Sequence, residues 1–184
     1  MRIITGTLKG RRLKAPDWPG LRPTSDKLRE TLFNVLGPRV VGATVVDAYA
    51  GTGAVGIEAL SRGAAFVTFV EQDRRAADLV AANLRLCGVD ERYAIIRVDF
   101  ARARLDPGHG PIDVIFLDPP YGAAEMTRAL DAADAMAGRD TRVIVEHAKR
   151  DAPPESRGRL VLTRDLMSGD SGLAFYGVQE SSRR

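Results

Sequence analysis

Asp118-Pro119-Pro120-Tyr121 directly follows an apolar run that ends at Leu117, and these residue types suit chemistry on a base amine. An exocyclic amine of a nucleic-acid base is a weak nucleophile because its lone pair is delocalised into the ring. The Asp118 carboxylate and the Pro119 carbonyl can accept hydrogen bonds from such an amine, and the rigid prolines hold that carbonyl in place. Tyr121 offers a flat face on which an extruded base can stack. We therefore predict catalytic roles for Asp118, Pro119 and Tyr121. Alone, the segment also suits a strand-ending turn with a core tyrosine.

A glycine loop follows an earlier apolar run, and its sequence predicts a cofactor site. Gly51-Thr52-Gly53-Ala54-Val55-Gly56 matches the pattern G-x-G-x-x-G, and Glu71 lies where a carboxylate can accept from both ribose hydroxyls. This pattern alone also suits a dinucleotide. Asp47, however, precedes the loop, where its charge would oppose a pyrophosphate but would suit the ammonium group of an amino acid, directly or through water.

The two segments together predict a methyl donor that carries an amino acid, which is S-adenosylmethionine. Methyl transfer from a sulfonium needs in-line placement and no covalent enzyme intermediate, so proximity and orientation supply most of the acceleration. Asp118 can also accept the proton, directly or through water. Asp99-Phe100, after another apolar run, can contact the adenine, although a helix cap and a core aromatic are an alternative. The residues predicted to bind the cofactor are Asp47, Tyr49, Ala50, Gly51, Thr52, Gly53, Glu71, Gln72, Asp99 and Phe100.

Alternating strands and helices are predicted to position these residues. Continuously apolar strands that alternate with helices indicate a parallel sheet covered on both faces, so we expect a doubly wound, mostly parallel α/β fold. The end of the chain, Arg159–Leu162 and Leu173–Val178, is predicted to form an antiparallel pair at the sheet edge, after a linker-like stretch at Asp151–Gly158. The expected strands are Thr44–Tyr49, Phe66–Val70, Tyr93–Val98, Ile112–Leu117 and Arg142–Glu146, and the expected helices are Asp26–Leu36, Ala54–Arg62, Asp73–Leu86 and Ala123–Met136.

Charge is concentrated at the start of the chain. Residues 1–39 hold nine Lys and Arg against three acidic residues, whereas the whole chain of 184 residues has a net charge of only +3. We predict a small basic N-terminal extension over 1–39 that contacts RNA phosphates, and a methyltransferase domain over 40–184. A merely solvated terminus is the alternative from charge alone. The predicted RNA-binding residues are Arg2, Lys9, Arg11, Arg12, Lys14, Arg22, Lys27 and Arg29.

Composition bounds the location and the partners. Cys87 is the single cysteine, and the sequence shows neither a signal peptide nor an apolar run near the ~20 residues that cross a bilayer. These features predict a cytoplasmic protein without a membrane span. We also expect no metal, and a monomer as the simplest assembly.

The sequence resembles the Rossmann-like class I methyltransferases that carry an aspartate- or asparagine-Pro-Pro-Tyr motif. It is most similar to the RsmD-like family of bacterial 16S rRNA (guanine(966)-N(2))-methyltransferases. The strings that separate this family from its relatives lie near the start, at Arg2-Ile3-Ile4-Thr5-Gly6, Lys9-Gly10-Arg11-Arg12-Leu13, Gly20-Leu21-Arg22-Pro23-Thr24 and Arg29-Glu30-Thr31-Leu32-Phe33-Asn34.

The resemblance implies a fold, a cofactor and a substrate. It places S-adenosylmethionine against Gly51–Gly53 with Glu71 on the ribose, and the base beside Asp118–Tyr121 with Arg22 at the rim. It also implies methylation of the guanine N2 amine in 16S rRNA, within an assembled or partly assembled small ribosomal subunit.

Three alternatives stay open at this point. Asp-Pro-Pro-Tyr serves an adenine N6 amine equally well, although the absence of an inserted target-recognition domain disfavours a sequence-specific DNA enzyme. A nucleotide-cofactor oxidoreductase and a noncatalytic RNA-binding module that keeps a cofactor pocket are the others.

Overall fold

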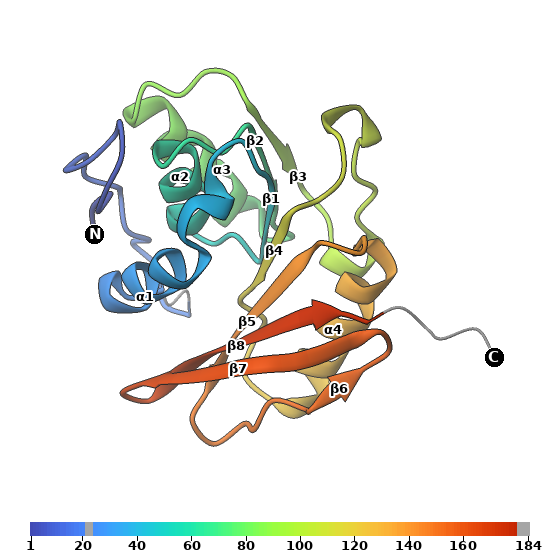
Figure 1. The fold of residues 1–184 in the computed structure, drawn as a ribbon. Coiled ribbons are helices and arrows are strands. Elements are labelled where there is room, and N and C mark those ends of the chain that lie inside the picture. Colours follow the sequence, from blue (N-terminus) through green and yellow to red (C-terminus); the bar gives the residue numbers. More distant parts are fainter. Residues whose placement is uncertain (21–23, 180–184) are drawn as a thin grey trace.

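The computed structural model describes residues 1–20 and 24–179, which form one mixed sheet with helices on both faces (Figure 1). The strand order is β3-β2-β1-β4-β5-β8-β7-β6. The strands are β1 Thr44–Ala48, β2 Phe66–Val70, β3 Tyr93–Ile96, β4 Val114–Leu117, β5 Arg142–Ala148, β6 Ser156–Arg157, β7 Leu160–Ser168 and β8 Ser171–Val178. The helices are α1 Asp26–Leu36, α2 Ala54–Ser61, α3 Arg74–Leu86 and α4 Ala123–Met136, with short 3-10 turns at Gly37–Val40, Phe100–Arg102 and Pro107–His109.

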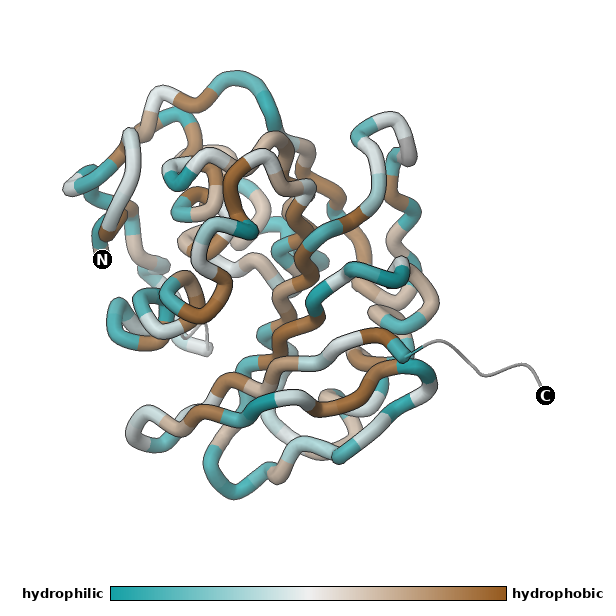
Figure 2. Tube along the Cα trace, in the orientation of Figure 1, coloured by the Kyte–Doolittle hydropathy of each residue, from teal (hydrophilic) through white to brown (hydrophobic). Residues whose placement is uncertain are grey.

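The five strands β1 to β5 are parallel to one another, as expected from their apolar runs. Figure 2 shows the hydrophobic colouring concentrated along the central strands, where both faces are covered. Side chains from α1, α2 and α3 share a buried cluster with one face of the sheet, and side chains from α4 share a second cluster with the other face. Because β1 to β5 are parallel, their carboxyl ends lie at the same edge of the sheet.

The C-terminal strands differ from the expectation in extent. The antiparallel pair is present, but β7 continues through Ser168 and the hairpin turns at Gly169-Asp170. β8 lies inside the sheet between β5 and β7, and the linker-like stretch contains β6. The length of β7 was underestimated because its polar residues break the apolar pattern. Only one face of this strand needs to be buried at this end of the sheet, so such residues are compatible with a strand.

The start of the chain is docked on the sheet domain. Ile3 and Gly10–Arg11 pair as a short hairpin, and Ile3 and Leu13 are buried in the same cluster as α1, α2 and α3. Glu58 of α2 accepts hydrogen bonds from the backbone N–H groups of Ile4 and Thr5 at 2.7 and 3.0 Å. The basic extension is therefore held rigidly against α2.

Candidate active site

A cavity of about 570 Å³ opens where the parallel strands end, a volume typical of small-molecule sites. Four neighbouring strands each bring a carboxylate to its wall: Glu71 after β2, Asp47 in β1, Asp118 after β4 and Glu146 in β5. The glycine loop and Asp118–Tyr121 line this same cavity, so the structure joins the two segments that the sequence pairs.

The glycine loop turns sharply between β1 and α2. Tyr49, Gly51 and Gly53 have positive φ angles of 59°, 57° and 75°, a backbone region that glycine adopts without strain. Gly56 is required for a different reason: a Cβ there would lie 2.3 Å from a ring carbon of Phe69. Absence of that side chain lets α2 pack tightly on β2, which brings the first turn of α2 to the cavity.

Asp47 of β1 is almost fully buried, and its Oδ2 accepts from the backbone N–H of Gly56 in the first turn of α2 at 2.8 Å. Burial, with a smaller contribution from the charge of Glu71, raises the pKa of Asp47 to about 8, although the Gly56 hydrogen bond opposes the shift. The expected charged carboxylate is thus largely protonated near neutral pH. A cation placed beside it would restore the charge.

Glu71 is buried and serves the loop directly. Its Oε2 accepts from the Gly51 N–H at 3.0 Å and its Oε1 accepts from the Asp73 N–H at 2.8 Å. Glu71 and Gln72 line the cavity together with Tyr49, Ala50, Gly51 and Thr52. Gly53 is the N-cap of α2 directly behind this wall.

Asp99 is a helix cap and Phe100 is a core aromatic, as in the alternative interpretation of this segment. Asp99 caps the 3-10 turn Phe100–Arg102 and forms an ion pair with Arg128 at 2.9 Å. Phe100 is buried and its ring centroid lies 5.9 Å from that of Tyr49. Their contact with an adenine stays a prediction.

The Asp118–Tyr121 segment forms the wall beside β4. Burial, and then the charges of Glu146, Asp47 and Glu71, raise the pKa of Asp118 well above its usual range. Tyr121 is 38% exposed, and its hydroxyl lies 3.5 Å from the Ser171 hydroxyl at the β7–β8 hairpin. A half-buried carboxyl therefore lies in the same wall as an accessible aromatic ring, an arrangement that suits binding of a flipped base.

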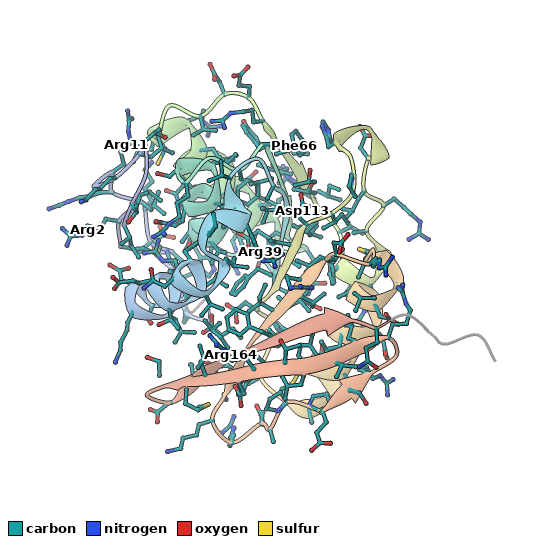
Figure 3. The ribbon with its side chains drawn as sticks, in the orientation of Figure 1. Arg2, Arg11, Arg39, Phe66, Asp113 and Arg164 are labelled. Carbon is teal, nitrogen blue, oxygen red and sulfur yellow. The ribbon has the colours of Figure 1, made fainter. Side chains whose placement is uncertain are left out.

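Among the described residues of the extension, every basic side chain except that of Arg29 is exposed to solvent. Arg2, Lys9, Arg11, Arg12, Lys14 and Lys27 are exposed, and Figure 3 shows Arg2 and Arg11 on the N-terminal hairpin. The prediction that Arg29 binds RNA is wrong, because its side chain is completely buried. Its guanidinium lies 2.5 Å from Asp26 and 3.6 Å from the buried Glu58, and it donates to the Arg2 carbonyl at 2.9 Å. Arg22 lies outside the described residues.

Asn83 of α3 connects the extension to the glycine loop. Its amide nitrogen donates to the carbonyl of Thr52 at 2.9 Å and to that of Lys14 at 3.2 Å, and its oxygen accepts from the Lys14 N–H at 2.8 Å. The side chain is fully buried. It therefore fixes the glycine loop relative to the N-terminal hairpin.

Several wall residues were not predicted from the sequence. Glu146 could have been found, because it ends the expected strand Arg142–Glu146 at the same edge as the other carboxylates. Residues of the β7–β8 hairpin and of α1 carry no chemical pattern and reach the cavity only through the fold. The unpredicted lining residues are Gly20, Thr24, Ser25, Leu28, Ala54, Val55, Phe116, Pro120, Glu146, Ser168, Asp170 and Ser171.

The described ranges 1–20 and 24–179 lack two kinds of feature, a metal-binding cluster and a membrane-spanning helix. There, no group of three or more His, Cys, Asp or Glu side chains could hold a metal ion, despite the carboxylates around the cavity. No helix in those ranges is long and apolar enough to cross a membrane.

Comparison with known proteins gives consistent matches along the chain. Residues 1–177 match the family model described as Conserved hypothetical protein 95. Ribosomal RNA small subunit methyltransferase D of Escherichia coli K12 is 36% identical over 178 residues, covering 96% of this chain and 89% of that protein. The solved structure of Escherichia coli yhhF is 31% identical with a TM-score of 0.83, covering 98% of this chain and 99% of the other.

A more distant structure shows the fold alone. An RNA methyltransferase from Salinibacter ruber, in complex with S-adenosyl-L-homocysteine, has a TM-score of 0.70 at 15% identity, covering 88% of this chain and 97% of that one. The expected doubly wound α/β architecture of class I methyltransferases is confirmed.

Proposed function

This chain belongs to the family described as Conserved hypothetical protein 95, and from that premise we propose that it is an S-adenosylmethionine-dependent ribosomal RNA methyltransferase. The specific reaction is methylation of the N2 amine of a guanine in 16S rRNA, of the guanine 966 type. The observation that carries the proposal is that the glycine loop and Asp118–Tyr121 line the same cavity, in a chain that matches ribosomal RNA small subunit methyltransferase D over 96% of its own length and 89% of that protein.

Residues on the β1–β2 side of the cavity would hold the cofactor. Positive φ angles at Gly51 and Gly53 let the loop backbone approach the ligand closely, and Glu71 is placed for the ribose hydroxyls. Asp47 lies where the ammonium group enters, and the approach of that cation lowers its pKa. S-adenosylmethionine supplies the methyl group on a sulfonium.

The acceptor amine binds at Asp118 and Pro119. Hydrogen bonds from the amine to the Asp118 carboxylate and to the Pro119 carbonyl draw electron density toward the nitrogen as it attacks. Tyr121 stacks on the base and holds the nitrogen in line with the methyl group. Because burial raises the pKa of Asp118, its ionised form is also a competent proton acceptor.

Residues 1–39 form the RNA-binding extension of a methyltransferase domain that covers 40–184. The exposed cations Arg2, Lys9, Arg11 and Arg12 belong to a hairpin docked on α2, so they meet the RNA as a fixed surface. Log affinity should fall with log salt by about 0.7 per phosphate contact on single strands. Replacing Arg11 or Arg12 by alanine should in each case reduce the magnitude of this slope by the amount of about one phosphate contact. An unchanged slope would show that the hairpin does not contact the RNA.

The partner is 16S rRNA within an assembled or partly assembled small subunit, and the protein acts as a cytoplasmic monomer. Mass mapping of ribosomal RNA from cells that lack this protein tests base, position and polymer together. We expect loss of one N2-methylguanine and its return with the wild-type chain but not with Asp118→Ala. Loss of a methyladenine instead would establish the adenine-N6 alternative.

Two further outcomes would point to other functions. Calorimetric titration with S-adenosylmethionine and with NAD separates a methyltransferase from an oxidoreductase, since tight NAD binding without a response to the methyl donor would overturn the proposal. Ribosomal RNA that keeps every methyl group in the deletion strain would favour a noncatalytic RNA-binding module.

A further inference from the structure

Glu146 lies on the acceptor side of the reacting centre. β5 pairs with β4 on the side away from β1, and the register Leu117↔Val145 places Glu146 next to Asp118. Phe116 and Ile144 both face the cluster that contains α1, so the two-residue alternation of strands puts Asp118 and Glu146 on that same face. The cofactor loop therefore lies on one side of Asp118 and Glu146 lies on the other.

The side chain is held in place by the segment that precedes α1. Glu146 is 7% exposed, and its Oε2 accepts from the Thr24 hydroxyl at 2.9 Å. An ionised carboxylate accepts at about four lone-pair positions, so the Thr24 bond is compatible with a further bond to a ligand. Both side chains line the cavity, and this contact fixes the direction from which Glu146 meets a bound base.

The carboxylates of Asp118 and Glu146 lie on adjacent strands, and their like charges repel in a partly desolvated site. After burial, the charge of Glu146 is the next cause that raises the pKa of Asp118, in keeping with their neighbouring positions on β4 and β5. Two interacting carboxylates on the wall of one cavity, one of them with a perturbed pKa, are typical of a functional site.

The edges of the two candidate bases differ at the atom beside the reactive amine. Guanine carries an N1–H next to its 2-amine, so it presents adjacent donors to a pair of acceptors. Adenine carries an unprotonated N1 next to its 6-amine, and that lone pair would face a carboxylate oxygen. A buried acceptor left opposite another acceptor disfavours the wrong base strongly.

We propose that Glu146 selects guanine by accepting a hydrogen bond from N1–H while Asp118 accepts from the 2-amine. This inference rests on the proposed function and adds a specificity residue to it. Asp-Pro-Pro-Tyr serves either base, whereas the carboxylate on the neighbouring strand fits guanine alone.

The test compares two bases that share the 2-amine. Full-length 16S rRNA is assembled by ligation with either guanine or 2-aminopurine at the mapped position and reconstituted into small subunits, since 2-aminopurine has the amine but no N1–H. The measurement is kcat/KM for methyl transfer from labelled S-adenosylmethionine to each particle. Wild-type enzyme should prefer guanine by about tenfold to a hundredfold, the range of a hydrogen bond to a charged group.

Glu146→Gln should narrow this preference by about tenfold, because the amide can also donate to the unprotonated N1 of 2-aminopurine. The ratio compares two substrates of one enzyme preparation, so any loss of folded enzyme cancels. Glu91→Gln, in an exposed loop before β3, is the matched control and should keep the wild-type ratio.

Three results would overturn the inference: equal use of both bases by the wild-type enzyme, an unchanged ratio in Glu146→Gln, or loss of transfer to both bases alike in a Glu146→Gln enzyme that keeps the wild-type urea midpoint. In each of the last two cases the wild-type enzyme still methylates guanine, so the proposed function stands. Absence of wild-type transfer to guanine, with transfer to an adenine elsewhere in the particle, would instead refute the proposed function.

Discussion

Replacing Asp47 by asparagine should stabilise the protein increasingly as pH rises. The pKa of Asp47 is about 8 in the folded chain against an ordinary value of 3.8, and burial is the main cause. Below pH 3.8 the carboxyl is protonated in both folded and unfolded chains. Between 3.8 and about 8 the unfolded chain has released a proton that the folded chain retains, so this contribution to stability is lost as pH rises.

The magnitude follows from the size of the shift. One pKa unit corresponds to about 1.4 kcal/mol, so the free energy of unfolding of the wild type should fall relative to the variant by about 3 kcal/mol between pH 5 and pH 7. Asparagine keeps an oxygen that can accept from the Gly56 N–H, and it has no proton to release. The variant should therefore lack this part of the pH dependence.

Urea denaturation at pH 5, 6, 7 and 8, without cofactor, measures the difference. Asp140→Asn, at an exposed turn before β5, is the control and should follow the wild type at every pH. If the free energies of unfolding of Asp47→Asn and wild type stayed parallel across this range, the assignment of a raised pKa to a buried Asp47 would be refuted.

Three further substitutions test other parts of the site. Gly56→Ala should cost about 1–3 kcal/mol by overpacking, because its Cβ would lie 2.3 Å from the Phe69 ring; an unchanged urea midpoint would contradict the close contact of α2 with β2. Arg29→Met should lower the free energy of unfolding by about 3 kcal/mol, because it removes a cation beside the buried Glu58. A stability equal to wild type in urea denaturation would contradict the buried position of Arg29 and make it a candidate for RNA binding again. The pKa of Asp118 is raised, so the rate of methyl transfer should rise with pH as Asp118 ionises, and Asp118→Asn should lack that rise. If both enzymes had the same pH profile, Asp118 would bind neither the proton nor the amine.

The sequence predicted the parallel core and its chemical segments because both rest on local patterns. Apolar runs identify strands, and the strand-end rule places Asp47, Glu71 and Asp118 at one edge. The same rule places Glu146 at this edge, because this residue ends the expected strand Arg142–Glu146.

Burial of charge is what the sequence could not reveal. Arg29 is one cation among nine in residues 1–39, and only the packing of α1 against α2 places it beside Glu58. The protonation of Asp47 likewise depends on desolvation by the whole sheet domain. The sequence predicted the antiparallel pair at the end of the chain, but no local pattern encodes the pairing of β8 with the distant β5, which brings Ser171 to the cavity wall.

The row of carboxylates also bears on the end of the reaction. Transfer of the methyl group converts a sulfonium into a neutral thioether, so the ligand loses one positive charge while the wall keeps Asp47, Glu71, Asp118 and Glu146. Attraction between cofactor and wall weakens at the moment the product forms, which we expect to favour exchange of spent cofactor for fresh cofactor. Asp47→Asn should reduce the ratio of the two affinities, and calorimetry with S-adenosylmethionine and S-adenosylhomocysteine would show an equal ratio if the wall charge had no such effect.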